Sequence, residues 1–166
     1  MNLQGGFNLK DETRQEKFRR IATKRMSRIF SNMNLIANLS NKKNYMYSQQ
    51  KVDELFQAYL DKGKEIRAYF ESQSPSHPLK EPYFKFIENT ERNTLMETKE
   101  EKFKRVAENR MKKVFYDMNL IANLSNRKHY TYSVQEVEEL FQAYHDKGKE
   151  VRAYFEPLKE EFSFSN

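Results

Sequence analysis

The chain has 166 residues, of which 37% are hydrophobic and 33% charged, with a net charge of +6 at pH 7. The apolar share is too small for one deep core, and four Gly and four Pro are too few for the many turns of an all-β fold. Cysteine is absent, which excludes disulfides, thiol nucleophiles and Cys-based zinc sites. No apolar stretch approaches the roughly 18–20 residues that span a bilayer, and no signal peptide is visible, so we expect a cytoplasmic protein outside the membrane.

An internal duplication organises the sequence. Glu16–Glu71 aligns without a gap with Glu101–Glu156, and roughly 70% of the positions are identical. The similarity continues into the segments that follow, because Pro-Leu-Lys-Glu occurs at 78–81 and again at 157–160. We therefore divide the chain into four parts: a first helical hairpin repeat at 11–71, a linker with an aromatic segment at 72–95, a second hairpin repeat at 96–156, and an aromatic tail at 157–166.

The first half of each repeat is predicted to be an amphipathic helix, because apolar residues recur largely at steps of three and four. In the first copy these residues are Phe18, Ile21, Ala22, Ile29, Met33, Ile36 and Leu39, and in the second they are Phe103, Val106, Ala107, Val114, Met118, Ile121 and Leu124. We expect the helix to end near Ser40 and Asn41, with Asn in a left-handed cap. The closely spaced Asn34, Asn38 and Asn41 are interpreted as side chains that hold the following loop, and a polar recognition surface is the alternative.

The second half of each repeat is predicted to be another helix. Ser48 and Ser133 are predicted to be N-caps. Ser133 with Glu136 forms a capping box. In the first copy Lys51 stands in place of the glutamate, so we expect a weaker cap there. Gly63 and Gly148 lie inside these helices, where each costs about 1 kcal/mol relative to Ala, so they indicate a close helix crossing or a bend.

We predict an all-α fold of two tandem-repeat helical hairpins, packed together as a pseudo-twofold four-helix bundle. One hairpin alone leaves too much of its apolar stripes uncovered. The alternative is two separate hairpin modules on a string. The alternating aromatics Tyr83, Phe84 and Phe86, and Phe162 and Phe164 in the tail, are expected to pack back on the bundle; pairing with the sheet edge of a partner is the alternative.

Positive charge is concentrated on the first helix of each repeat and on the loop after it, whereas the second helices are balanced or acidic. Clustered cations beside tyrosines are suited to bind phosphates and stack on bases. A solvated face with salt bridges to acidic helices is the alternative. The predicted nucleic-acid-binding residues are Lys17, Arg20, Lys24, Arg28, Lys42, Lys43 and Tyr45 in the first repeat, and Lys102, Arg105, Lys112, Lys113, Arg127, Lys128 and Tyr130 in the second.

Catalysis has little support in the sequence. The histidines His77, His129 and His145 are not repeated between the copies, and no His-x-x-x-His pair, phosphate-binding Gly loop or nucleophile elbow is present. We expect no enzyme activity, no cofactor and no metal site.

The pattern Asn-Leu-Ser-Asn-(Lys/Arg)-Lys-x-Tyr-x-Tyr-Ser, followed by Val-x-Glu-Leu-Phe, starts at Asn38 and again at Asn123. It resembles uncharacterised small helical-hairpin proteins of bacterial phages, plasmids and integrative elements, here as a tandem duplicate. The resemblance implies a bacterial mobile element but no known activity. We expect a non-enzymatic protein that binds the phosphate backbone of DNA or RNA. The alternative is a protein-binding module, such as an inhibitor or accessory subunit that docks on a nucleic-acid-processing complex.

Overall fold

The computed structural model describes residues 11–71, 78–87, 96–158 and 161–165, and these segments contain helices but no strand. The long helices are α1 (Arg14–Ala37), α2 (Gln49–Glu71), α3 (Lys99–Ala122) and α4 (Val134–Ala153). Short 3₁₀ turns, η2 (Asn38–Ser40) and η3 (Asn123–Ser125), extend α1 and α3. The predicted all-α fold is confirmed.

Side-chain caps fix where the helices begin. The predicted capping box of Ser133 and Glu136 starts α4. At the start of α2 the Ser48 hydroxyl accepts a hydrogen bond from the Lys51 backbone N–H at 3.3 Å, and Lys51 has no carboxylate to return the bond. Two more capping boxes, which we did not predict, start α1 at Thr13 and α3 at Thr98.

The predicted left-handed cap is wrong. Asn41 has φ −69° and ψ 101°, because the chain leaves α1 through a 3₁₀ turn and then extends. The structural interpretation of Asn41 is correct, since its Oδ1 accepts the Lys43 backbone N–H at 3.0 Å, and Asn126 makes the same bond to Lys128. Asn34 and Asn38 are exposed. Only the last residue of the Asn block therefore shapes the loop.

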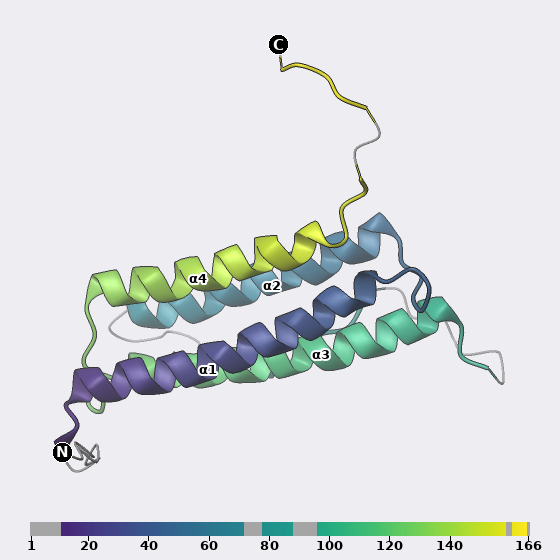
Figure 1. Ribbon diagram of the computed structural model, residues 1–166. Helices are drawn as coiled ribbons and strands as arrows, with labels where there is room; N and C mark the ends of the chain where they lie inside the picture. The colour runs from purple at the N-terminus through teal and green to yellow at the C-terminus, as the bar shows by residue number, and fades with distance from the viewer. Residues whose placement is uncertain (1–10, 72–77, 88–95, 159–160, 166) are drawn as a thin grey trace, which may run out of the picture.

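The helices form two layers, one of α1 and α3 and one of α2 and α4, with the two helices of each layer antiparallel (Figure 1). Helix packing runs mainly between the repeats: α1 and α2 both pack on α3 and α4. Each hairpin is thus open, and its apolar stripes are covered by the other hairpin. The four-helix bundle is confirmed, and the alternative of two separate modules is excluded.

The pseudo-twofold axis passes between Tyr59 and Tyr144. Their rings stack with centroids 3.9 Å apart, and each hydroxyl donates to the other residue's backbone carbonyl, at 2.5 and 2.6 Å. Gly63 and Gly148 face these rings so closely that a Cβ would lie 2.6 Å from Tyr144 Cε1 and 2.5 Å from Tyr59 Cε1. The glycines mark a close crossing, as one of the two readings of the sequence predicted.

The two aromatic segments behave differently. Residues 78–87, which we call the strap, lie against α2 and α3, and Phe84 and Phe86 are buried there beside Phe115 and Phe103. The C-terminal tail instead leaves the bundle (Figure 1), with Phe162 82% and Phe164 86% exposed. The prediction of packing is confirmed for the strap and wrong for the tail, which lacks a counterpart to the linker residues 72–77.

No described helix is long and apolar enough to cross a bilayer.

Candidate nucleic-acid interface

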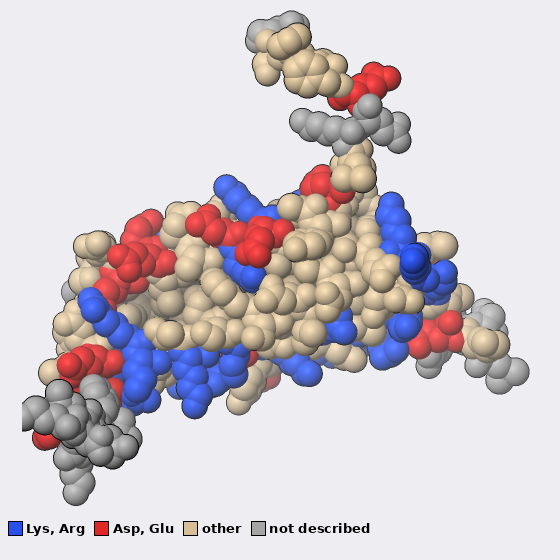
Figure 2. Space-filling model, in the orientation of Figure 1, with Lys and Arg blue, Asp and Glu red and all other residues tan. Residues whose placement is uncertain are grey.

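The cations predicted from the sequence gather on the α1–α3 layer. Figure 2 shows Lys and Arg side chains crowded over α1, whereas Asp and Glu dominate over much of α4. Because α1 and α3 are antiparallel, the basic start of each first helix lies beside the loop that follows the other first helix. The fourteen predicted residues therefore fall into two equivalent clusters at opposite ends of the bundle and a group between them.

The first end is defined by Lys17 and Arg20 of α1 with Arg127, Lys128 and Tyr130 of the loop after η3. The Lys17 Nζ lies 5.5 Å from the centroid of the Tyr130 ring, which joins the two repeats at this point. Arg127 and Lys128 are exposed, and neither has an ion pair with a described carboxylate. Two exposed cations thus lie beside a half-buried tyrosine.

The second end repeats this arrangement with Lys102 and Arg105 of α3 and with Lys42, Lys43 and Tyr45 of the loop after η2. The Lys102 Nζ lies 5.2 Å from the Tyr45 ring centroid, and Lys42 and Lys43 are exposed. The structure therefore brings together loop and helix residues that are far apart in the sequence, as the symmetric counterpart of the first end.

Arg20 and Arg105 are less available than predicted. The guanidinium of Arg20 donates to both carboxylate oxygens of Glu12, at 2.7 and 3.0 Å, and Arg105 does the same to Glu97. The hydrogen bond to the carboxylate raises the pKa of each arginine and lowers the pKa of Glu12. About half of each side chain remains exposed, at 47% and 52%, so both pairs lie at the surface. These two arginines thus form ion pairs with residues just before their own helices and not with the acidic second helices.

Between the ends lie Lys24, Arg28, Lys112 and Lys113. Lys24 and Lys113 are exposed, whereas the Lys112 Nζ lies 5.7 Å from the ring centroid of Tyr83 in the strap. Arg28 crosses to α3 and donates to the buried carboxylate of Asp117 at 3.0 Å. The middle of the layer is therefore positive but partly neutralised.

Other arginines of this layer hold the helices together. Arg25 donates to the backbone carbonyl of Leu120 at 2.5 Å, and Arg110 donates in the same way to Leu35. Each guanidinium thus binds a carbonyl near the end of the opposite helix, where such groups lack a helical partner. Burial lowers the pKa of Arg25. These two cations, which are not among the predicted binding residues, belong to the α1–α3 interface.

Arg19, at the first end, connects two helices through an ion pair. It donates to Glu136 at 2.6 Å, beside a second bond from Gln15 at 2.7 Å. Burial raises the pKa of Glu136, but the hydrogen bonds from Arg19, Gln15 and Ser133 outweigh burial and bring that pKa to about 2. This pair fastens the start of α1 to the start of α4.

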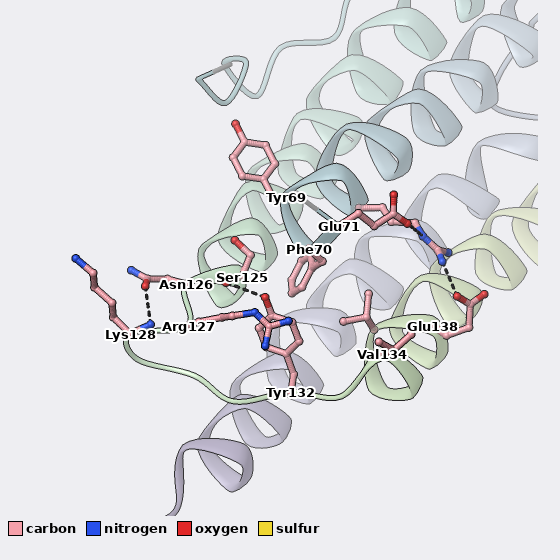
Figure 3. Close-up of a pocket in the computed structure, with 12 residues that line it drawn as sticks. Tyr69, Phe70, Glu71, Ser125, Asn126, Arg127, Lys128, Tyr132, Val134 and Glu138 are labelled. Atoms are coloured by element: carbon pink, nitrogen blue, oxygen red, sulfur yellow. Dashed lines mark hydrogen bonds and ion pairs between the residues drawn. The ribbon is translucent and has the colours of Figure 1, made fainter. Parts of the chain in front are cut away.

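An open pocket of about 910 Å³ adjoins the first end (Figure 3). Arg127 and Lys128 line one side, and the Arg127 guanidinium lies 4.4 Å from the Tyr132 ring centroid. On the other side Arg67 is neutralised by Glu71 and Glu138. The pocket therefore offers free positive charge only on its loop side. Sequence reasoning missed it, because its walls come from α2, α4 and the loop, and no pattern along the chain joins them.

Among the described residues there is no group of three His, Cys, Asp or Glu side chains that could hold a metal ion. His129 is exposed and His145 half-buried, and His77 lies outside the described residues. No protein-family model matches the sequence, and no curated protein or solved structure is significantly similar to it. Function therefore has to be inferred from the arrangement of charge and aromatic rings.

Proposed function

We propose that this protein binds the phosphate backbone of nucleic acid, without catalysis, through the two ends of its α1–α3 layer. The observation that carries the proposal is the repeated combination of a lysine–tyrosine pair with two exposed loop cations, Arg127 and Lys128 at one end and Lys42 and Lys43 at the other. Cations bind phosphates by releasing condensed counterions, and tyrosine rings stack on bases that are accessible.

The spacing of the two ends favours a duplex. Both ends lie on one layer, and α1 with its 24 residues is about 36 Å long. One turn of B-DNA is about 34–36 Å, so contacts at the two ends would meet phosphates on the same side of the duplex. The pseudo-twofold axis between the ends matches the local twofold symmetry of a duplex backbone.

The test is the salt dependence of binding to a duplex of about 20 base pairs, or two helical turns. Removing the charge of Arg127 and Lys128 with glutamine should reduce the slope of log K against log salt by about 1.8, since each phosphate contact contributes about 0.9. Lys64→Gln with Lys149→Gln is the matched control, because these exposed lysines lie on the second helices and give the same change in net charge. The proposal fails if neither duplex nor single-stranded probes bind at low salt, or if the control loses the same slope.

A protein-binding role is the second candidate, supported by the exposed aromatic side chains of Tyr154, Phe162 and Phe164. Apolar anchors of this kind carry most of the energy of protein interfaces. In this case the protein would act as an inhibitor or accessory subunit on a nucleic-acid-processing complex. Capture of the same partner from nuclease-treated bacterial lysate by wild type and by the Arg127→Gln, Lys128→Gln variant would favour this candidate. The bacterial mobile-element setting and the cytoplasmic location stay predictions.

A further inference from the structure

The strap occupies a site whose polar parts are repeated on the opposite side of the bundle. In the strap, the Lys80 backbone N–H donates to Glu65 at 3.1 Å, and the Lys80 carbonyl accepts from Asn119 at 3.1 Å. The equivalent positions of the other repeat are Glu150 and Asn34. The residues that anchor the backbone of the strap between α2 and α3 are thus both present between α4 and α1.

The apolar and charged parts of the site are repeated as well. Phe84 contacts Phe115, Phe86 contacts Phe103, and the Ile87 backbone N–H donates to Glu54 at 3.2 Å. Their partners on the α1–α4 side are Phe30, Phe18 and Glu139. The lysine over Phe115 also has a counterpart, because Lys147 lies over Phe30 at 5.2 Å as Lys62 lies over Phe115 at 5.6 Å.

Phe18 is buried against Phe70 and Tyr132, but the rest of this second site is more exposed than the site that holds the strap. We call it the α1–α4 seam, defined by Phe30, Asn34, Glu139, Leu140 and Glu150. Leu140 and Phe30 are half-buried, whereas their strap-side equivalents are 0% and 6% exposed. Glu150 and Asn34 are exposed, whereas the equivalents that bind the strap are half-buried.

The segment that matches the strap is the C-terminal tail. It repeats Pro-Leu-Lys-Glu and carries Phe162-Ser163-Phe164 in place of Phe84-Lys85-Phe86. The Phe162 and Phe164 rings contact each other edge-on with centroids 4.8 Å apart, close to the 5.0 Å of Phe84 and Phe86. The strap and its site thus both have a counterpart in the second repeat, but in this structure the C-terminal tail does not lie in the α1–α4 seam.

The tail has almost no spare length to fill the seam of its own chain. For Phe164 to reach the level of Leu140, the chain must run back along α4 from Glu156 over about 24 Å. The eight residues from Glu156 to Phe164 span at most about 26–29 Å when fully extended, and part of that length is used to reverse direction at the end of the helix. The strap has six additional linker residues, 72–77, before its Pro-Leu-Lys-Glu.

We infer that the α1–α4 seam binds the Phe162-Ser163-Phe164 tail of a second copy of this chain, and that reciprocal exchange of tails forms a dimer. Reciprocal exchange closes the assembly with twofold symmetry. It also removes Phe162 and Phe164 from water, and these are the most exposed aromatic side chains among the described residues. Three strap contacts have different residues on the seam side, with Glu136, Thr23 and Ser27 in place of Lys51, Glu108 and Lys112. The seam therefore repeats most of the contacts that hold the strap but lacks these three.

The experiment measures the mass of the full-length chain by sedimentation equilibrium over a wide concentration range. Wild type should rise from the monomer mass of 20.1 kDa to twice that mass. Phe162→Ser with Phe164→Ser should stay monomeric, and so should Asn34→Asp with Glu139→Lys, which changes two exposed seam residues. Val134→Ser is the control, because it removes an apolar side chain that is 86% exposed elsewhere. Circular dichroism of each variant reports that the bundle is intact.

Mixing the two monomeric variants distinguishes tail exchange from other contacts. The tail variant keeps an intact seam and the seam variant keeps an intact tail, so the mixture should form a heterodimer that neither forms alone. A wild type that stays monomeric at every concentration overturns the inference, including the case in which the tail folds onto its own seam. The inference is also overturned if the seam variant associates as strongly as wild type, because the tail would then bind elsewhere.

Discussion

Replacing Gly63 with alanine tests the close crossing at the centre of the bundle. In an open helical position the change would stabilise the protein by about 1 kcal/mol, because alanine is the better helix former. At Gly63 the new Cβ would lie 2.6 Å from Cε1 and 3.1 Å from Cδ1 of Tyr144, both too short for a carbon–carbon contact. The sign of the effect therefore depends on whether Tyr144 can move.

The Tyr144 ring has little room to retreat. It stacks on Tyr59 with the ring planes 11° apart, and its hydroxyl donates to the Tyr59 carbonyl at 2.6 Å. Overpacking a filled core costs about 1–3 kcal/mol, and the middle of that range exceeds the gain of about 1 kcal/mol in helix propensity. We expect Gly63→Ala to lower the free energy of unfolding by about 1 kcal/mol, and to lower Tm by about 2–4 °C.

The assay is equilibrium unfolding in urea, followed by circular dichroism. The control is the pair Lys64→Ala and Lys64→Gly at the exposed neighbouring position, which measures helix propensity in the same turn without the ring. Alanine should be the more stable of that pair by about 1 kcal/mol. If Gly63→Ala is as stabilising as the Lys64 pair predicts, the ring moves freely and the reasoning about a tight crossing is wrong. Gly148→Ala should give the same loss as Gly63→Ala, because its Cβ would meet Tyr59 at 2.5 Å.

Two further predictions concern carboxylates. Because the folded-state pKa of Glu136 is depressed to about 2 from its ordinary 4.5, its charge stabilises the fold above about pH 4.5, and that contribution is lost as the pH falls from there to 2. Urea unfolding at several pH values should therefore show a shallower loss of stability between pH 4.5 and 2 for Glu136→Gln than for wild type, and equal slopes would contradict the pairing with Arg19. Asp117→Asn should release Arg28, cost less than about 1 kcal/mol of stability because the Arg28 side chain is 44% exposed, and steepen the salt dependence of duplex binding by about 0.9. Weaker binding of Asp117→Asn at low salt would show that Arg28 does not reach a phosphate.

Much of the fold could be predicted because its signals are local. The apolar stripes predicted the helices, Ser133 with Glu136 predicted a helix start, and Gly63 and Gly148 predicted a crossing or a bend, of which the structure has the crossing. The pairing of helices could not be read in the same way. A stripe that faces the second helix of its own repeat has the same period as one that faces the other repeat, so the open hairpins follow only from the assembled bundle.

The sequence predicted which helices carry the positive charge of the site, but not which partners the individual cations contact. The bias of positive charge to the first helices is visible in the sequence, but the partners of individual cations are not. Arg20 pairs with Glu12, eight residues earlier and outside the helix, where the spacing rules of three and four do not apply. The contact of Lys17 with Tyr130 depends on α1 and α3 being antiparallel, which no local pattern reports.

The two repeats pack on each other as the subunits of a homodimer would, but they belong to one chain. The two ends of the bundle can therefore differ in sequence. In a homodimer a substitution changes both sides at once, whereas here the equivalent positions hold Glu136 on one side and Lys51 on the other. Glu136 binds Arg19 at the first end, and the positions equivalent to this pair hold two cations, Lys51 and Lys104, at the second end. The ion pair that ties the start of α1 to the start of α4 therefore has no equivalent acid–base pair in the sequence at the second end. A substitution in this pair alters one end of the bundle alone, which a duplicated chain permits and a homodimer does not.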